Sequence, residues 1–509
     1  MTRVVIAAGS QTAADSGAQI AEDGGNAIDA AIGAAMVLMI SEPGICAPGA
    51  GGFITLRRPG EHPVTVDANV AMPGLGVDPG RFGVFSRQVS MEYGGGVTTV
   101  VGYESIAIPG GLAGLGEVWT RWGRAPWSEV LAPAVALARV GIRLSEAAHV
   151  YLGYAHDQIF GWHPISHASI HDARGDLLEP GSLVEVPGLA DTLTELGERG
   201  AEDFYQGEIA RVLVKDLVEG GSLITAADLA AYLPTIRPAL RSTVGPWDVY
   251  TCPPPSIGGV TLTAMLELAT ASFSTDSVVG YQPPTVDQLI ASQAAVLRYR
   301  RDHLDRAQDL GVETKALLDR LADGDHLGWI SSPSTVHASA VGDDGSACSI
   351  TMSAGYGSGV VAGSTGMWMN NSLGEAELNR RGFHTMEVGA HLPSNMAPTI
   401  AIRHDGAVLS VGSPGADRIT TALQQVLLAI GSGSELQAAV DAPRLHVEPA
   451  GDELTVAYEA GLGMPSDVST RRFDEPHMFF GAVAAAMFDP DRGLTAAADL
   501  RRGGGVAAA

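Results

Sequence analysis

Residues 335–353 read TVHASAVGDDGSACSITMS, the most regular stretch of the chain. Two runs of strand-forming residues, 335–341 and 347–353, flank Gly342-Asp343-Asp344-Gly345, which is typical of a hairpin turn. We therefore predict a β-hairpin. Just before it, residues 321–334 lose periodicity and gather Gly, Asp, Ser and Pro, which indicates an exposed connector. Thr335 is thus expected to open a strand directly behind a flexible loop.

Outward from the hairpin, helix-type and strand-type periodicities alternate. Helices are predicted over residues 12–40 with a break at Gly24-Gly25, and over 114–122, 127–140, 203–232, 260–269, 286–310 and 419–430. Strands are predicted over 53–56, 64–66, 249–251, 399–402 and 408–411. The solvent face of helix 286–310 is assigned Arg298, Arg300, Arg301 and Asp302. This order favours sheet layers covered by helices, folded as one compact unit.

The composition restricts the classes of function. Of the 509 residues, 46% are hydrophobic and 17% charged, which indicates a globular chain. The 57 acidic residues exceed the 31 basic ones and give a net charge of −26. Such a surface repels nucleic-acid phosphates and anionic lipids, so we expect no nucleic-acid partner and no membrane partner.

Three further features favour a cytoplasmic protein. Cys46, Cys252 and Cys348 match no metal or disulfide spacing, so buried free thiols are expected. Residues 1–10 are typical of an opening strand rather than of a signal peptide. The longest apolar stretch, 27–40, is too short to span a bilayer.

Other motif candidates do not meet the requirements of their chemistry. The glycines of 355–359 are not followed by the helix that a dinucleotide loop needs. Ser413 lacks the glycine two residues earlier that a serine elbow requires. His163, His167 and His171 show no metal-binding spacing and are interpreted as solvated loop residues. We therefore expect no metal and no cofactor.

Thr335 remains as a candidate nucleophile. A threonine hydroxyl becomes nucleophilic when a base stands beside it, and an N-terminal threonine supplies that base through its own α-amine. This chemistry requires a backbone break just before Thr335. On spacing alone, however, a threonine that opens a β-hairpin is usually just a good strand former.

A resemblance to a known family decides between these readings. The chain carries, in order, blocks that resemble those of the γ-glutamyltranspeptidases. They are GGNAIDAA at 24–31, EP at 42–43, GGF at 51–53, PGGLAG at 109–114, WGRAPW at 122–127, FYQG at 204–207, DLAAY at 228–232, PPPSIGG at 253–259, TVH at 335–337, NN at 370–371, SNMAPT at 394–399, GSPG at 412–415, DAPRLH at 441–446 and DLRRGG at 499–504.

The resemblance implies an α+β fold, the αββα four-layer sandwich of the N-terminal nucleophile hydrolases. It also implies that the chain cuts itself between Ser334 and Thr335. Residues 1–334 and 335–509 would then form a heterodimer, which can pair further into a dimer of heterodimers. Thr335 would be the nucleophile, with its free amine as base, and would form an acyl-enzyme released by water or by an acceptor amine.

The remaining site residues also come from the resemblance. Ser353 matches the family's second threonine, which orients the nucleophile. Gly415 and Ala416 match the paired glycines whose N–H groups stabilise the oxyanion, provided that Ala416 can adopt the required backbone angles.

The substrate pocket departs further from the family pattern. Asn69 stands where the family has an arginine that clamps the substrate α-carboxylate. Because a bidentate charged clamp becomes at most a neutral hydrogen bond, glutamate recognition is expected to weaken. Glu375 replaces the usual aspartate that holds an ammonium group, and Ser394-Asn395 replace a pair of serines.

The sequence thus predicts a self-processing threonine amidohydrolase or acyltransferase acting on a small-molecule amide. The acyl group is γ-glutamyl, as in glutathione metabolism, or a similar small group. The alternatives are a hydrolase of non-glutamyl amides, resembling cephalosporin acylases or oxamate hydrolases, and an uncut, non-catalytic homologue.

Overall fold

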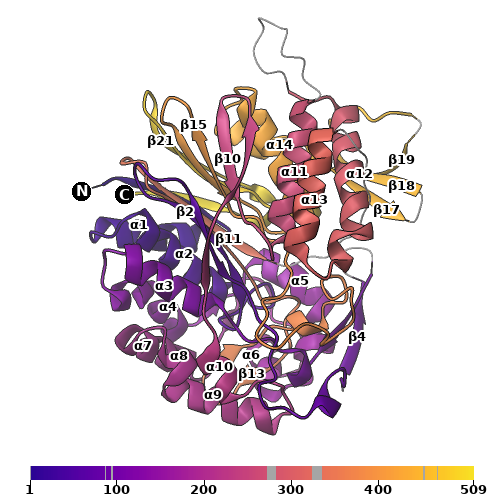
Figure 1. Ribbon diagram of the computed structural model, residues 1–509. Helices are drawn as coiled ribbons and strands as arrows, with labels where there is room; N and C mark the ends of the chain where they lie inside the picture. Colours follow the sequence, from indigo (N-terminus) through magenta and orange to yellow (C-terminus); the bar gives the residue numbers. More distant parts are fainter. Residues whose placement is uncertain are drawn as a thin grey trace, which may run out of the picture.

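The computed structural model describes residues 2–85, 87–92, 96–271, 283–323, 335–450, 453–466 and 468–509. Two β-sheets face each other, and helices cover the outer side of each (Figure 1). This arrangement confirms the predicted four-layer αββα order. Of the predicted connector, residues 321–323 are helical, and residues 324–334, with Ser334 at the predicted cut, lie outside the described residues.

The first sheet holds seven strands in the order β22-β1-β11-β12-β2-β3-β8. They are β1 Val4–Ala8, β2 Gly51–Arg57, β3 Val64–Ala68, β8 Thr235–Pro238, β11 Val336–Gly342, β12 Ala347–Ser353 and β22 Gly505–Ala508. The predicted hairpin is its central pair, β11 and β12. Both predicted fragments contribute strands to this sheet: β22, β11 and β12 follow residue 334, and β1, β2, β3 and β8 precede it. Because β1 lies between β22 and β11, the two fragments are interleaved in space.

The second sheet holds six strands in the order β21-β20-β16-β15-β10-β9. They are β9 Leu240–Val244, β10 Trp247–Thr251, β15 Thr399–Arg403, β16 Val408–Gly412, β20 Ala484–Asp489 and β21 Gly493–Ala498. Its strands β16 and β20 lie against β11 of the first sheet. The predicted strands at 249–251, 399–402 and 408–411 are confirmed within it.

Polar side chains link the two sheets inside the sandwich. His337 of β11 lies with Nδ1 2.8 Å from Thr351 Oγ1 and with Nε2 2.9 Å from Ser339 Oγ. Ser410 of β16 donates to Ser339 Oγ at 3.0 Å and so joins the sheets. Complete burial lowers the pKa of His337 from 6.5 to about 3, so this imidazole is neutral in the folded protein.

Helices α1 and α2 pack on the outer side of the first sheet, α1 against β22 and β1 and α2 against β11 and β12 (Figure 1). The helices of this layer are α1 Gln11–Glu22, α2 Ala27–Ser41, α3 Gly111–Trp122, α4 Trp127–Val140 and α7 Leu189–Arg199. The predicted break at Gly24-Gly25 separates α1 from α2. Asn26 then caps α2, because its side chain accepts from the Asp29 amide while the Asp29 carboxylate accepts from the Asn26 amide.

Helices cover the second sheet, and one of them differs from its prediction. They are α11 Ile257–Ala271, α12 Val286–Asp302, α13 Leu310–Asp323, α14 Arg418–Gly431 and α15 Leu436–Asp441. The helix predicted over 286–310 ends at Asp302. Arg300, expected to face solvent, is only 1% exposed, because its Nε donates to the buried Asp305 carboxylate at 3.0 Å in the turn that follows.

The other elements lie around the two layers. The helices are α5 Glu146–Ala155, the π-helix η4 His156–Phe160, α6 Pro164–Ile170, α8 Asp203–Gln206, α9 Glu208–Glu219 and α10 Ala226–Ala231. The short strands are β4 Arg87–Met91, β5 Val97–Val101, β6 Ile142–Arg143, β7 Leu183–Val184, β13 Val361–Ala362, β14 Met367–Trp368, β17 Leu445–Ala450, β18 Glu453–Glu459 and β19 Ser469–Phe473.

The histidines around α6 and the three cysteines are all described by the structure. His163 and His171 are buried at the ends of α6, so their interpretation as solvated loop residues is wrong. Cys46, Cys252 and Cys348 are buried free thiols, as predicted. Over the described ranges, the structure has no helix with both the length and the apolar character needed to cross a bilayer.

We predict that acid destabilises this fold through His337. Its pKa is lower in the folded than in the unfolded chain, so the unfolded chain takes up the proton, and stability falls as the pH drops from about 6.5 toward about 3. His337→Gln removes this titration, so its melting temperature should fall less than that of the wild type between neutral pH and pH about 5.

The matched control is His404→Gln, which changes an exposed histidine. It should keep the wild-type pH dependence. A His337→Gln protein whose melting temperature depends on pH as steeply as that of the wild type would show that His337 is not the group responsible.

Candidate active site

Thr335 lies at the head of the central strand β11 and is 3% exposed. In the antiparallel β11–β12 pair, Val336 is opposite Met352. The same register, extended by one residue, sets Thr335 opposite Ser353, the last residue of β12. The two hydroxyl-bearing residues that the resemblance assigns to catalysis are therefore cross-strand neighbours at the same end of β11 and β12.

The next two strands bring Asn69 to the same end of the sheet. Ser353 pairs with Gly51 at the start of β2, and Gly52 pairs with Ala68 at the end of β3. Asn69 follows Ala68 directly. A Cβ on Gly51 would lie 2.3 Å from the Val70 backbone nitrogen, so only glycine permits this close approach of the chain beside Asn69.

The loop with Gly415 and Ala416 reaches this end from the second sheet. It follows β16, whose last residue, Gly412, packs on the His337 ring: a Cβ there would lie 2.2 Å from His337 Cε1. Ser349 of β12 donates to the Val411 carbonyl at 3.0 Å. The end of β16 is thereby fixed against the hairpin.

Ala416 adopts the left-handed conformation, with φ +57°, and Gly415 has φ +122°. Ala416 therefore does adopt the glycine-like backbone angles that the sequence comparison required. For a residue with a Cβ, this conformation costs about 1–2 kcal/mol. Among the described residues, no acceptor binds the N–H of Gly415 or of Ala416. Both groups precede the N-terminus of α14, where a developing negative charge is favoured.

Asp417, which the sequence analysis missed, anchors this loop. Its buried carboxylate lies 2.7 Å from Arg418 Nη1 and 3.3 Å from His446 Nε2. Burial opposes ionisation, but the neighbouring Arg418 and His446 outweigh it and hold the pKa of Asp417 well below its ordinary value. Its position directly after the Gly-Ala pair was the available sequence signal.

Asn69 is buried, and its side chain and backbone form hydrogen bonds within the protein. Its Nδ2 donates to the Leu392 carbonyl at 2.7 Å, and its own carbonyl accepts from the Tyr232 hydroxyl at 2.6 Å. Its backbone N–H donates to Asp67 Oδ1 at 3.1 Å. Position 69 therefore presents no positive charge, and one of the two N–H groups of its side-chain amide is already used.

Ser394 and Asn395 lie close by, because the segment from Leu392 onward runs beside Asn69. The Ser394 hydroxyl accepts from the Met396 amide at 3.2 Å. Asn395 Oδ1 is buried and finds no donor among the described residues. A buried acceptor without a partner calls for a ligand or a water molecule.

Glu375 lies against the loop that follows Ser353. A Cβ on Gly355 would lie 2.6 Å from Glu375 Oε1. Burial, and then the negative charge of Glu377, hold the pKa of Glu375 well above its ordinary value. Glu377 in turn accepts from the Tyr356 hydroxyl at 2.6 Å. The sequence analysis missed this second carboxyl group.

The preceding asparagines have a structural role. Asn370 Nδ2 donates to the carbonyls of Gly49 and Ala107, at 2.8 and 3.0 Å. Asn371 Nδ2 donates to Thr99 Oγ1 and to the Val100 carbonyl, both at 3.0 Å. These amides tie the segment that carries Glu375 to the first 334 residues.

A cavity of about 540 Å³ opens beside the Asn69 loop, with Tyr232, Arg237 and His391 in its wall. His391 Nδ1 lies 2.9 Å from Asp67 Oδ1, and Arg237 Nη2 lies 3.5 Å from Asp67 Oδ2. Because Asp67 also accepts from the Asn69 backbone N–H, its contacts with His391 and Arg237 hold the Asn69 loop in place. Asp67 too was missed from the sequence.

All eight residues predicted for the site thus converge on one edge of the sandwich. Register places Thr335, Ser353 and Asn69, and loop packing places the others. Their roles in catalysis and binding stay predictions.

Comparison with known proteins identifies the family of the chain. A family model described as Gamma-glutamyltranspeptidase matches residues 13–509. The chain is 28% identical over 493 residues to the glutathione hydrolase proenzyme of Escherichia coli (strain K12), covering 89% of this chain and 82% of that protein. It is 30% identical over 492 residues to the glutathione hydrolase proenzyme of Pseudomonas aeruginosa, covering 89% and 84%.

A solved structure shares the fold. The cephalosporin acylase from Bacillus halodurans superposes with a TM-score of 0.78 at 22% identity, covering 99% of this chain and 96% of that one. The chain is therefore an amide-bond hydrolase or transferase with the N-terminal nucleophile hydrolase fold, and it belongs to the gamma-glutamyltranspeptidase family.

Proposed function

We propose that the chain is a self-processing threonine amidohydrolase or acyltransferase that opens γ-glutamyl or similar small amide bonds through an acyl-enzyme on Thr335. The observation that carries the proposal is the position of Thr335. It precedes strand β11 and, by the register of the hairpin, faces Ser353. The end of β16, which leads into the loop that holds Gly415 and Ala416, packs on His337, two residues from Thr335.

In this proposal, cleavage of the Ser334–Thr335 bond frees the α-amine of Thr335. The amine takes the proton from the Thr335 hydroxyl as its oxygen attacks the substrate carbonyl. The N–H groups of Gly415 and Ala416 donate to the oxyanion, and Ser353 orients the attacking hydroxyl. The leaving amine departs with a proton, and water or an acceptor amine then attacks the ester and restores Thr335.

Recognition of the acyl group is proposed to depend on its amine more than on its carboxylate. Glu375 and Glu377 form a buried acidic pair, and a cation bound beside them favours their ionised form. An ammonium group on the substrate fits this pair. Asn69 offers no matching charge to an α-carboxylate, because its side-chain amide is neutral, and one of its N–H groups already donates to the Leu392 carbonyl.

A second candidate follows from the same position. Because Asn69 replaces a charged clamp, the pocket also suits acyl groups without an α-carboxylate. Hydrolysis of non-glutamyl small amides by the same threonine chemistry is therefore the alternative function.

We predict that the purified protein consists of two fragments, the smaller beginning Thr-Val-His-Ala. Thr335→Ala removes the hydroxyl that attacks both the preceding peptide bond and the substrate, so this variant should stay as one chain and lack turnover. Intact-mass measurement and N-terminal sequencing test the cut, and release of p-nitroaniline from an acyl anilide tests turnover.

Thr335→Ser is the matched control, because it keeps the hydroxyl and loses only a methyl group. It should still be cut and should retain measurable turnover. A wild-type protein that remains a single chain without turnover would support the non-catalytic alternative, and turnover by Thr335→Ala would refute the threonine mechanism.

We also predict that removal of the substrate α-carboxylate costs little. A charge-assisted clamp contributes about 1.5–3 kcal/mol, or about 10- to 150-fold in rate. Without that clamp, 4-aminobutanoyl p-nitroanilide should react with a kcat/KM within about tenfold of that of γ-glutamyl p-nitroanilide. Glutaryl p-nitroanilide, which lacks the amine that Glu375 would hold, should lose more.

Glu375→Gln separates the two recognition elements. It should lower kcat/KM for the two amine-bearing substrates and leave that for the glutaryl substrate nearly unchanged. A loss above about 100-fold for the 4-aminobutanoyl substrate would reveal a charged clamp elsewhere in the pocket.

A further inference from the structure

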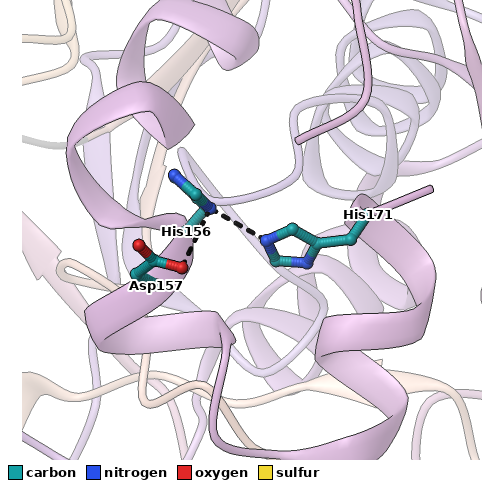
Figure 2. A group of neighbouring side chains, drawn as sticks. All are labelled: His156, Asp157 and His171. Atoms are coloured by element: carbon teal, nitrogen blue, oxygen red, sulfur yellow. Dashed lines mark hydrogen bonds and ion pairs between the residues drawn. The ribbon is translucent and has the colours of Figure 1, made fainter. Parts of the chain in front are cut away.

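Three side chains that could ligate a metal converge outside the candidate active site, where η4 faces the end of α6 (Figure 2). His156 Nδ1 lies 2.8 Å from His171 Nε2 and 3.5 Å from Asp157 Oδ1. The three ligand atoms all lie within 4.8 Å of one another. Two imidazole nitrogens and one carboxylate oxygen form a donor set that suits zinc and its neighbours among the divalent transition metals.

His171 is already oriented for this role. It is 6% exposed, and its Nδ1 lies 2.9 Å from the His167 carbonyl. Because a carbonyl only accepts, Nδ1 carries the proton and Nε2 keeps a lone pair, which is directed at His156. A backbone carbonyl on the remote nitrogen is the usual device that fixes the tautomer of a metal-binding histidine.

The packing around His171 also holds the plane of its ring. The His167 ring stacks on it with centroids 4.2 Å apart and an interplanar angle of 16°. On the opposite side of the cluster, His156 begins the π-helix η4, a wide turn of a kind that is frequent at functional sites. The His156 and Asp157 side chains are 24% and 83% exposed, so the cluster is open to solvent.

We propose that His156 Nδ1, His171 Nε2 and the Asp157 carboxylate bind one zinc ion, with water completing a tetrahedral shell. Zinc–nitrogen bonds of about 2.0–2.1 Å at tetrahedral angles separate two ligand atoms by about 3.3 Å. The His156–His171 separation of 2.8 Å therefore needs to widen by about 0.5 Å. The His156–Asp157 separation of 3.5 Å is already close to the required value.

The bound ion would cross-link η4 and the end of α6, next to the helices that support the loop after Ser353. Tyr151 of α5 donates to the Tyr356 carbonyl at 3.0 Å, and Ser166 of α6 donates to the Gly359 carbonyl at 2.6 Å. An ion that joins η4 to the end of α6 would therefore stabilise both supports of this loop. Its effect is on stability and not on the chemistry at Thr335.

The test is a titration of the tag-free full-length protein with Co²⁺, followed by visible absorbance, and then displacement with Zn²⁺. One equivalent of Co²⁺ should give a saturable tetrahedral spectrum that Zn²⁺ removes. Binding should weaken at least about tenfold in His156→Ala and in Asp157→Asn. His404→Ala, which removes an exposed histidine elsewhere, should bind as the wild type does.

A second readout is the melting temperature, with metal-free melting of each variant as the check on folding. Zn²⁺ should raise the melting temperature of the wild type and of His404→Ala, and not that of His156→Ala. The proposal is overturned if no saturable one-equivalent binding occurs. It is also overturned if both ligand variants bind as tightly as the wild type, which would mean that His156 and His171 form only a hydrogen-bonded pair.

Discussion

The antiparallel register of β11 and β12 is the constraint on which the rest of the structure depends. Side chains alternate between the two faces of a strand, so a slip of one residue would turn Thr335 away from Ser353 and reverse every side chain of the hairpin. The polar contacts of His337 with Thr351 and Ser339, and of Ser339 with Ser410, fit one register only. The same contacts therefore fix the hairpin and set its distance from the second sheet.

The interleaving of the strands explains how the fold can tolerate a break before Thr335. The two strands of the hairpin lie between β1 and β2, and the C-terminal β22 pairs with β1. Asn370 and Asn371 add side-chain bonds to the backbone around Gly49, Val100 and Ala107. Strand pairing and these side-chain hydrogen bonds thus join the parts before and after Thr335 independently of the connecting peptide bond.

Local periodicity was enough to predict the elements that carry their own signals. The hairpin has a turn sequence between two strand-type runs, and α1 and α2 are separated by a glycine pair. The failures came from tertiary pairing. The charge of Arg300 indicated exposure, but Asp305 pairs with it inside the protein. The polarity around His163 and His171 hid a short, partly buried helix. The contacts of Asp417 with His446 and of Asp67 with His391 join residues that are distant in sequence, so the sequence around each aspartate does not reveal its partner.

We propose the hydroxyl of Thr335 as the nucleophile of a site assembled by the β11–β12 register. The most direct measurement is to treat the protein with an electrophilic diazoketone analogue of the acyl group and to map the modified residue by peptide mass spectrometry. We predict one label per chain, on Thr335, with loss of turnover in proportion to labelling. A label on another residue, with turnover lost while Thr335 stays unmodified, would contradict it.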